Sequence, residues 1–249
     1  MKFSVCLDAL YNGKDFINSM EQVSQYHFDA VEFWCWWDKD IQAIKKAKER
    51  LKMEIAGFCT KFISLVDSRQ RTAYLQALEE TIQIAKELGC HMIITQVGND
   101  FGISRVAQKL SLIEGLKACV PILEKHQMLL VFEPLNTIVD HPGYYLSSSE
   151  EAFQIAEEVD SPHVKVLFDV YHQQIMEGNI ISRITENIDK IGHFHFAGVP
   201  GRNELNRGEL NYSGIINAIK ATSYDGYLGL EYFPKDDPSL GLSDLISEV

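Results

Sequence analysis

The chain has 249 residues, of which 46% are hydrophobic and 23% are charged, and its formal net charge is −12. This composition indicates a globular protein with enough apolar material for one large core. The acidic charge argues against nucleic acid and anionic membranes as partners, because both are bound by clustered Lys and Arg.

Nothing in the sequence predicts a membrane span or a secretory leader. No apolar run approaches the roughly 20 residues that span a bilayer, and an Asp interrupts the N-terminal stretch MKFSVCLDALYNG. The cysteines are odd in number and show neither C-x-x-C pairs nor zinc spacing. We therefore expect a cytoplasmic protein with reduced, structural thiols at Cys6, Cys35, Cys59, Cys90 and Cys119.

Apolar strand-like runs alternate with helix-like segments along the whole chain. The last segment, SLGLSDLISEV (239–249), is short and predicts an abbreviated final helix. In chain order, the predicted elements are strand 2–7, helix 14–26, strand 30–36, helix 40–51, strand 54–60, helix 69–88, strand 91–97, helix 104–126, strand 128–135, helix 148–159, strand 164–172, helix 175–188, strand 192–198, helix 212–222 and strand 227–233.

This alternation predicts a single domain over residues 1–249. Strands separated by helices pair in parallel, and near-continuous apolar strands imply that both faces of the sheet are covered. Eight such units in this length favour a closed (β/α)8 TIM barrel over an open doubly wound sheet. The segment after the first strand, LDALYNGKD, also lacks the G-x-G-x-x-G fingerprint of dinucleotide-binding sheets.

Ionisable residues lie near the C-terminal ends of four successive predicted strands. Glu133 ends strand five, Asp169 ends strand six, His195 lies in strand seven, and Glu231 ends strand eight. Consecutive strands of a parallel barrel are usually neighbours, about 4.8 Å apart. The four side chains are therefore expected to converge on one mouth of the barrel.

Three carboxylates in such a space repel one another and lose hydration unless a cation compensates. Any one of these residues alone would be explained more simply as a hydrogen-bonded core polar group. Four in succession favour a metal site of Glu133, Asp169, His195 and Glu231. This oxygen and nitrogen donor set suits one divalent cation, Mn²⁺, Mg²⁺ or Co²⁺, with positions left for substrate.

Further polar residues surround this predicted site. His193 shares the face of His195 but lies one layer deeper, which favours a core or supporting role. His172 lies one turn past Asp169 and is placed to reach a substrate oxygen. The glycine-punctuated loop VPGRNELNRGELNY offers Arg202 and Glu204, of which Arg202 is either a clamp for substrate oxygens or a solvated surface residue.

The segment VEFWCWWDKD carries a second polar signal inside a predicted strand. Glu32 faces the barrel interior if its apolar neighbours face the helices. Trp34, Trp36 and Trp37 crowd the end of the same strand. They either shield a small polar substrate from water or pack as ordinary core residues.

Four stretches resemble the hydroxypyruvate isomerase family, within the xylose isomerase-like TIM barrels. They are EPLNTIVDHPGYYLSSSEEA, KVLFDVYHQQIMEGNI, GHFHFAGVPGRNELNRGELNY and YDGYLGLEYFP. The resemblance covers most of the chain and implies a metal-assisted isomerase or epimerase of small sugars or related acids. It implies that Glu133 and Glu231 are both ligands and the acid/base pair, while Asp169 and the residue of strand seven complete the metal shell.

The reaction expected at this constellation is isomerisation of an α-hydroxycarbonyl compound, such as hydroxypyruvate or tartronate semialdehyde, through an enediolate. One glutamate removes a C–H proton and the other returns a proton, while a divalent ion stabilises the developing charge. One position departs from the family pattern. Hydroxypyruvate isomerases carry Gln where this chain has His195, whereas the related ketose 3-epimerases carry His.

Several alternatives remain open on the sequence. The reaction could be 3-epimerisation of a free or phosphorylated ketose, or dehydration of a cyclic ketone. Abasic-site endonucleases share the barrel, but they need several zinc ions and a basic face, which this acidic chain with eight histidines fits poorly. A non-catalytic metal- or sugar-binding barrel is a further reading. We expect a small-molecule substrate, and the aromatic content is compatible with a homo-oligomer.

Overall fold

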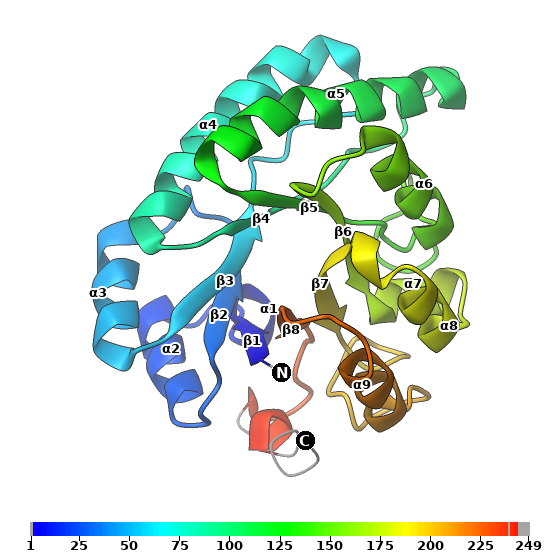
Figure 1. The fold of residues 1–249 in the computed structure, drawn as a ribbon. Coiled ribbons are helices and arrows are strands. Elements are labelled where there is room, and N and C mark those ends of the chain that lie inside the picture. The colour runs from blue at the N-terminus through cyan, green and yellow to red at the C-terminus, as the bar shows by residue number, and fades with distance from the viewer. Residues whose placement is uncertain (1, 239, 244–249) are drawn as a thin grey trace.

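Eight parallel strands close into a barrel in sequence order, which confirms the predicted (β/α)8 TIM barrel (Figure 1). The computed structural model describes residues 2–238 and 240–243. The strands are β1 (Lys2–Cys6), β2 (Ala30–Phe33), β3 (Glu54–Cys59), β4 (Met92–Thr95), β5 (Leu129–Phe132), β6 (Val164–Asp169), β7 (Ile191–Phe196) and β8 (Tyr227–Leu230).

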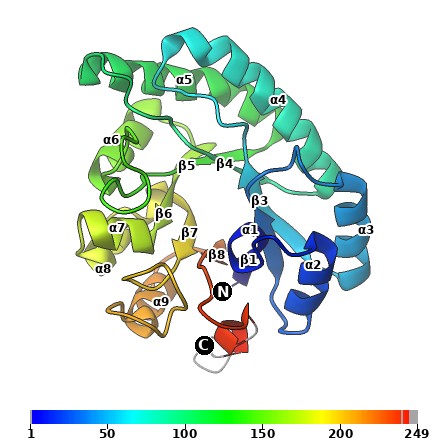
Figure 2. The same cartoon turned by 180° about the vertical axis from the view of Figure 1, so that it is seen from behind.

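The helices surround this barrel in both views (Figures 1 and 2). Their apolar faces pack against the outward-facing residues of the strands and form the main core. No helix in residues 2–238 and 240–243 is long and apolar enough to cross a membrane. The helices are α1 (Leu7–Leu10), α2 (Phe16–Ser24), α3 (Ile41–Leu51), α4 (Arg71–Leu88), α5 (Arg105–His126), α6 (Ser149–Val159), α7 (Val170–Met176), α8 (Ile180–Glu186) and α9 (Tyr212–Lys220), with 3-10 turns at Ser68–Gln70 and Ile188–Lys190.

Side-chain caps fix where several of these helices begin. Asp15 caps α2, Asp40 caps α3 and Ser148 caps α6, each by accepting a hydrogen bond from a backbone N–H in the first turn. Such caps satisfy donors that the helix itself leaves unpaired. The three caps therefore explain why these helices begin at Phe16, Ile41 and Ser149.

The predicted strands all extend one to three residues past the observed C-terminal ends, α1 is not among the predicted elements, and two predicted elements differ further. The strand expected over 164–172 ends at Asp169, because the Asp169 carboxylate caps α7 immediately afterwards. The helix expected over 175–188 is divided into α7 and α8 with a following 3-10 turn. Gly178 and Asn179 cause this break, since both adopt a positive φ that a continuous helix does not allow. Most of the expected final helix, residue 239 and residues 244–249, lies outside the described residues.

The barrel interior is divided into an apolar and a polar half. Strands β3 to β6 contribute a small separate apolar cluster of Cys59, Met92, Ile94, Val131 and Leu167. On the opposite side, Ser4 of β1, Glu32 of β2 and the two histidines of β7 are all buried. The five cysteines form no disulfide, and four of them are buried, which agrees with structural thiols.

Candidate active site

The structure brings the four residues of the strand ends into one buried cluster. Glu133 follows β5, Asp169 ends β6, His195 lies in β7, and Glu231 follows β8. One potential ligand atom from each side chain lies within 4.8 Å of the others. Their positions follow from register, because Asp169 pairs with His195 across neighbouring strands and both side chains face inward.

Asp169 is oriented by the helix that follows it. Its Oδ1 accepts hydrogen bonds from the backbone N–H groups of Tyr171, at 2.7 Å, and His172, at 3.2 Å. The other oxygen, Oδ2, is left facing the cluster, 3.4 Å from Nε2 of His172. The cap therefore fixes which oxygen of Asp169 is available as a ligand.

The residues present fit a divalent cation. Oε1 of Glu133 and Nδ1 of His195 are buried and have no hydrogen-bond partner among the described residues. Nδ1 of His195 lies 3.3 Å from an oxygen of Glu231 and 4.0 Å from Oε1 of Glu133. Unsatisfied buried acceptors are costly, and a cation would satisfy them. Three carboxylates with one imidazole form a donor set suited to Mn²⁺, Mg²⁺, Co²⁺ or Zn²⁺.

The two glutamates have opposite electrostatic environments. Burial and the neighbouring charge of Glu231 raise the pKa of Glu133 well above its usual range. Burial also acts to raise the pKa of Glu231, but His195 and Arg202 together bring it well below its usual range. Burial raises the pKa of Asp169 to about 6. Without a cation, the cluster thus divides its protons unequally among its carboxyl groups.

His172 is held in one tautomer by Asn136. Its Nδ1 accepts from the backbone N–H of Asn136 at 3.2 Å and lies 2.7 Å from the side-chain Nδ2 of the same residue. A backbone N–H can only donate, so Nδ1 is an acceptor and the ring proton of the neutral imidazole resides on Nε2. Burial and the nearby Arg202 lower the pKa of His172 well below its usual range. The neutral ring therefore presents a donor towards Asp169.

Arg202 is buried and contacts the cluster directly. Its Nη2 donates to Glu231 and lies 3.5 Å from Oδ2 of Asp169. The guanidinium is also placed over the rings of Tyr171 and Phe233, at 5.3 and 5.7 Å from their centroids. The structure thus contradicts the interpretation of Arg202 as a solvated surface residue, while its role as a clamp for substrate oxygens stays a prediction.

A cavity of about 310 Å³ opens onto this cluster. Trp34 lines it and donates from Nε1 to Oε1 of Glu231 at 2.6 Å. The other two tryptophans of the segment lie elsewhere, because Trp36 bonds to Thr81 of α4 and Trp37 is 39% exposed. The apolar residues that line the cavity, besides Trp34, are Cys59, Phe62, Ile94, Leu135 and Phe233.

Glu204 is not among the residues that line this cavity. Its Oε1 accepts from the backbone N–H of Lys235 at 3.0 Å, and its Oε2 lies 3.5 Å from Nε of Arg207. A direct substrate contact by Glu204 stays a prediction.

Sequence reasoning missed Gln96 and His141, which do line the cavity. Gln96 lies in the predicted strand 91–97, where its alternation with Met92 and Ile94 could have indicated an inward direction. His141 lies in the loop between β5 and α6, where no periodicity indicates the direction of a side chain.

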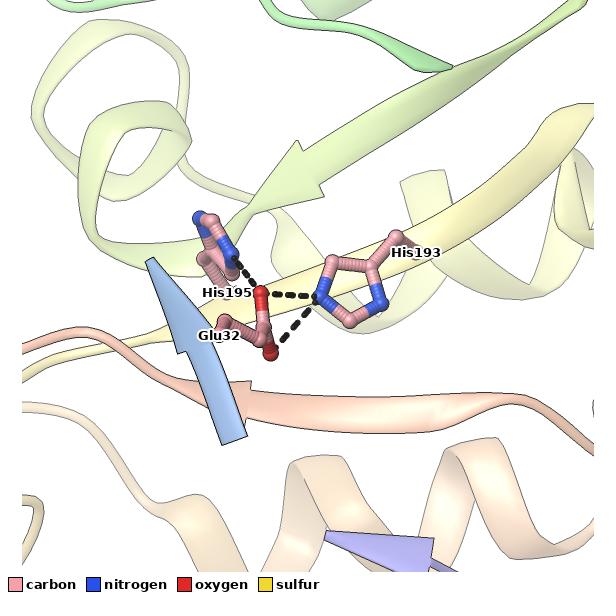
Figure 3. A group of neighbouring side chains, drawn as sticks. All are labelled: Glu32, His193 and His195. Carbon is pink, nitrogen blue, oxygen red and sulfur yellow. Dashed lines mark hydrogen bonds and ion pairs between the residues drawn. The ribbon is translucent and has the colours of Figure 1, made fainter. Parts of the chain in front are cut away.

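Glu32 faces the barrel interior, as expected, and lies between two histidines (Figure 3). His193 contacts Glu32 in this deeper layer rather than the four-residue cluster. Burial acts to raise the pKa of Glu32, but His193 and His195 together hold it well below its usual range. A second buried polar layer, in which Glu32 contacts His193 and His195, therefore lies beneath the cluster at the barrel mouth.

Comparison with known proteins shows similarity over nearly the whole chain. The model of the xylose isomerase-like TIM barrel family matches residues 20–247. Hydroxypyruvate isomerase from Escherichia coli (strain K12) is 31% identical over 254 residues, which cover 97% of each chain.

Two solved structures share the fold. The crystal structure of an AP endonuclease, family 2, from Brucella melitensis has a TM-score of 0.94 and 26% identity, over 99% of this chain and 98% of that chain. A D-psicose 3-epimerase, crystallised in the presence of D-fructose, has a TM-score of 0.80 and 20% identity, over 98% and 89%. The second likeness shows the barrel architecture alone.

Proposed function

Because the chain belongs to the hydroxypyruvate isomerase family within the xylose isomerase-like TIM barrels, and is an isomerase, we propose that it converts a small α-hydroxycarbonyl compound. The proposed substrate is hydroxypyruvate or a close relative such as tartronate semialdehyde, and the reaction depends on one divalent cation. The net charge of −12 favours such a small molecule over a DNA strand, since DNA binding relies on clustered Lys and Arg.

The observation that carries this proposal is the buried cluster of Glu133, Asp169, His195 and Glu231. These residues would hold the cation through three carboxylates and Nδ1 of His195. A bound divalent cation would polarise the substrate carbonyl and stabilise the negative charge that develops on its oxygens.

The two glutamates carry the proton transfers in this mechanism. A C–H bond beside a carbonyl loses its proton to one carboxylate, and an enediolate forms. The other glutamate then gives a proton to the adjacent carbon, while the hydroxyl proton moves to the former carbonyl oxygen. Oε1 of Glu133 has no hydrogen-bond partner among the described residues and is available for this role. Glu231 is held in place by Trp34 and Arg202, which fix its carboxylate beside the cavity.

His172 and Arg202 orient the substrate. The Nε2–H of His172 donates to a substrate oxygen, because its Nδ1 is already occupied by Asn136. Arg202 supplies a buried positive charge that binds a carboxylate or hydroxyl oxygen. The apolar residues that line the cavity exclude water from the reacting carbons.

Replacement of either glutamate by glutamine tests the acid/base assignment. Glu133→Gln and Glu231→Gln should each lower kcat by about 10²-fold to 10⁴-fold, because each removes a proton-transfer group without changing side-chain size. Glu177→Gln is the matched control, since Glu177 bonds only to Ser148, Ser149 and Arg183 outside the cavity. Near-normal turnover in both site variants would contradict the assignment.

Epimerisation of a ketose at C3 is the second candidate reaction. His195 favours it, because the related epimerases carry His where hydroxypyruvate isomerases carry Gln. Turnover of hydroxypyruvate should be compared with that of a panel of free ketoses, each with added Mn²⁺. Preferred turnover of hydroxypyruvate supports the isomerase, whereas preferred turnover of a ketose supports the epimerase.

A further inference from the structure

The layer beneath the cluster contains one carboxylate that two histidine rings share (Figure 3). Oε2 of Glu32 lies 3.0 Å from Nε2 of His193 and 3.0 Å from Nε2 of His195. Oε1 of the same carboxylate is 3.1 Å from Nε2 of His193 and accepts from the Ser4 hydroxyl. All of these side chains are almost completely buried.

We propose that Glu32 is a positioning residue that fixes the ring of His195 so that its Nδ1 lone pair points at the cation site. This inference rests on the proposed cation-dependent function. Glu32 itself touches neither the cavity nor the four-residue cluster except through His195. Its action on the reaction would therefore be indirect.

The position of the lone pair on His195 follows from the chemistry of its imidazole ring. A neutral ring has one N–H and one lone pair, so a hydrogen bond at one nitrogen decides the role of the other. Because Nε2 of His195 donates to Glu32, Nδ1 is left with the lone pair. That atom has no hydrogen-bond partner among the described residues and faces Glu133 and Glu231. Partners of this kind orient histidine ligands and raise their basicity.

The surrounding strands hold Glu32 in this position from three sides. Ser4 of β1 fixes one oxygen, and His193 bonds to both oxygens from β7. On β8, Gly229 leaves the space that the carboxylate occupies. A Cβ atom at Gly229 would lie 2.5 Å from Oε1 of Glu32 and 2.7 Å from Cδ2 of His195. The absence of a side chain there is thus a requirement of the polar layer.

The same three residues could instead be read as a second cation site, because their ligand atoms lie close together. The contacts argue against this reading. Nε2 of His193 and Nε2 of His195 each lie at hydrogen-bond distance from the Glu32 carboxylate, and Ser4 also donates to that carboxylate. The polar atoms of the layer therefore satisfy one another, unlike those of the cluster above it.

Calorimetric titration with Mn²⁺ tests the proposal. Wild-type protein should bind one ion, and Glu32→Gln should bind it about 10-fold to 100-fold more weakly, the range typical for loss of such a supporting partner. Glu177→Gln is the control for the same chemical change outside the barrel and should bind Mn²⁺ as wild type does. An unchanged Kd in Glu32→Gln overturns the proposal. A second bound ion that Glu32→Gln removes also overturns it.

Ser4→Ala keeps the proposal testable if Glu32→Gln does not fold. It removes one hydrogen bond to Glu32 and should weaken Mn²⁺ binding about twofold to tenfold. Ser111→Ala is its control, because Ser111 donates a buried hydrogen bond to Leu65 outside the barrel. Equal affinity in Ser4→Ala and wild type overturns the proposal.

A ring-proton signal separates positioning from a general loss of structure. In the ¹H–¹⁵N spectrum of the Mg²⁺-loaded protein, the Nε2–H of His195 should show a hydrogen-bonded resonance that shifts in Glu32→Gln, while backbone resonances elsewhere stay in place. An unchanged resonance overturns the proposal. Failure of wild-type protein to bind any divalent ion would instead contradict the proposed function, and this inference with it.

Discussion

At the scale of single residues, the site must compensate the negative charge of three buried carboxyl groups. Glu133, Asp169 and Glu231 are buried together, and the guanidinium of Arg202 contacts Asp169 and Glu231. Buried carboxylates without compensation are strongly disfavoured. Arg202 contacts two of them, so it offsets part of the negative charge that would otherwise be left to a cation alone.

This balance predicts opposite effects on binding and turnover when Arg202 is replaced. Arg202→Gln removes a positive charge beside the cluster, so Mn²⁺ should bind at least as tightly as in wild type. Turnover should fall about 10-fold to 100-fold, because a charge-assisted contact to the substrate is lost. Calorimetry and steady-state kinetics measure the two effects separately.

Arg207→Gln is the matched control for Arg202→Gln. Arg207 lies in the same loop but pairs with Glu204 and Asp236 away from the cavity, so its replacement should leave turnover near normal. Loss of Mn²⁺ binding in Arg202→Gln would contradict the charge argument, since it would mean that Arg202 supports the cluster structurally.

At the scale of elements, one residue both ends a strand and caps the helix that follows it. Asp169 ends β6, caps α7 and faces the cluster, so one side chain couples the local structure to the site. The other elements place their caps away from the mouth residues. Asp40, for example, caps α3 by accepting from the N–H of Ala43 at 3.0 Å.

Removal of a helix cap that lies outside the cluster should lower the free energy of unfolding without changing the affinity for Mn²⁺. Asp40→Ala should lower the free energy of unfolding by about 0.5–2 kcal/mol, whereas Asp40→Asn should keep most of it, because Asn also caps helices. Urea denaturation measures the difference. Equal stability of Asp40→Ala and wild type would show that the cap contributes nothing, and altered Mn²⁺ affinity would show that α3 acts on the site.

The sequence predicts the elements better than the contacts between them. Alternating apolar runs indicate the eight strands, and the positions of Glu133, Asp169, His195 and Glu231 at strand ends follow from the same pattern. The contact of Glu32 with the β7 histidines does not follow, because it joins residues 161 and 163 positions apart and exists only once the barrel closes.

Local structure set by single hydrogen bonds is also hard to predict. Helix α7 begins directly after Asp169 because the Asp169 side chain caps it, and the apolar strand pattern does not indicate this cap. The tautomer of His172 likewise depends on the backbone N–H of Asn136, which lies on another βα loop. The first contact is local and the second is tertiary, but neither hydrogen bond leaves a hydrophobic pattern in the sequence.

At the scale of the whole molecule, barrel closure brings residues from four strand ends together at the proposed cation site. Cation binding should therefore stabilise the entire fold, because the unfolded chain does not assemble the four ligands. At a concentration 100 times its Kd, Mn²⁺ should add about 2.7 kcal/mol to the free energy of unfolding.

For a domain of this size, that gain corresponds to a rise in Tm of roughly 5–10 °C. Differential scanning calorimetry with and without a chelator measures it. Asp169→Asn is the control, because Asn still caps α7 but is a weaker, uncharged ligand, so its Tm should respond little to Mn²⁺. An equal rise in wild type and Asp169→Asn would place the bound ion elsewhere.

The most direct test of the account is anomalous scattering from crystals soaked in Mn²⁺. We expect one strong peak at the barrel mouth, within bonding distance of Glu133, Asp169, Glu231 and Nδ1 of His195. A mouth without a peak, with the same four side chains bonded into separate protein networks, would contradict this expectation.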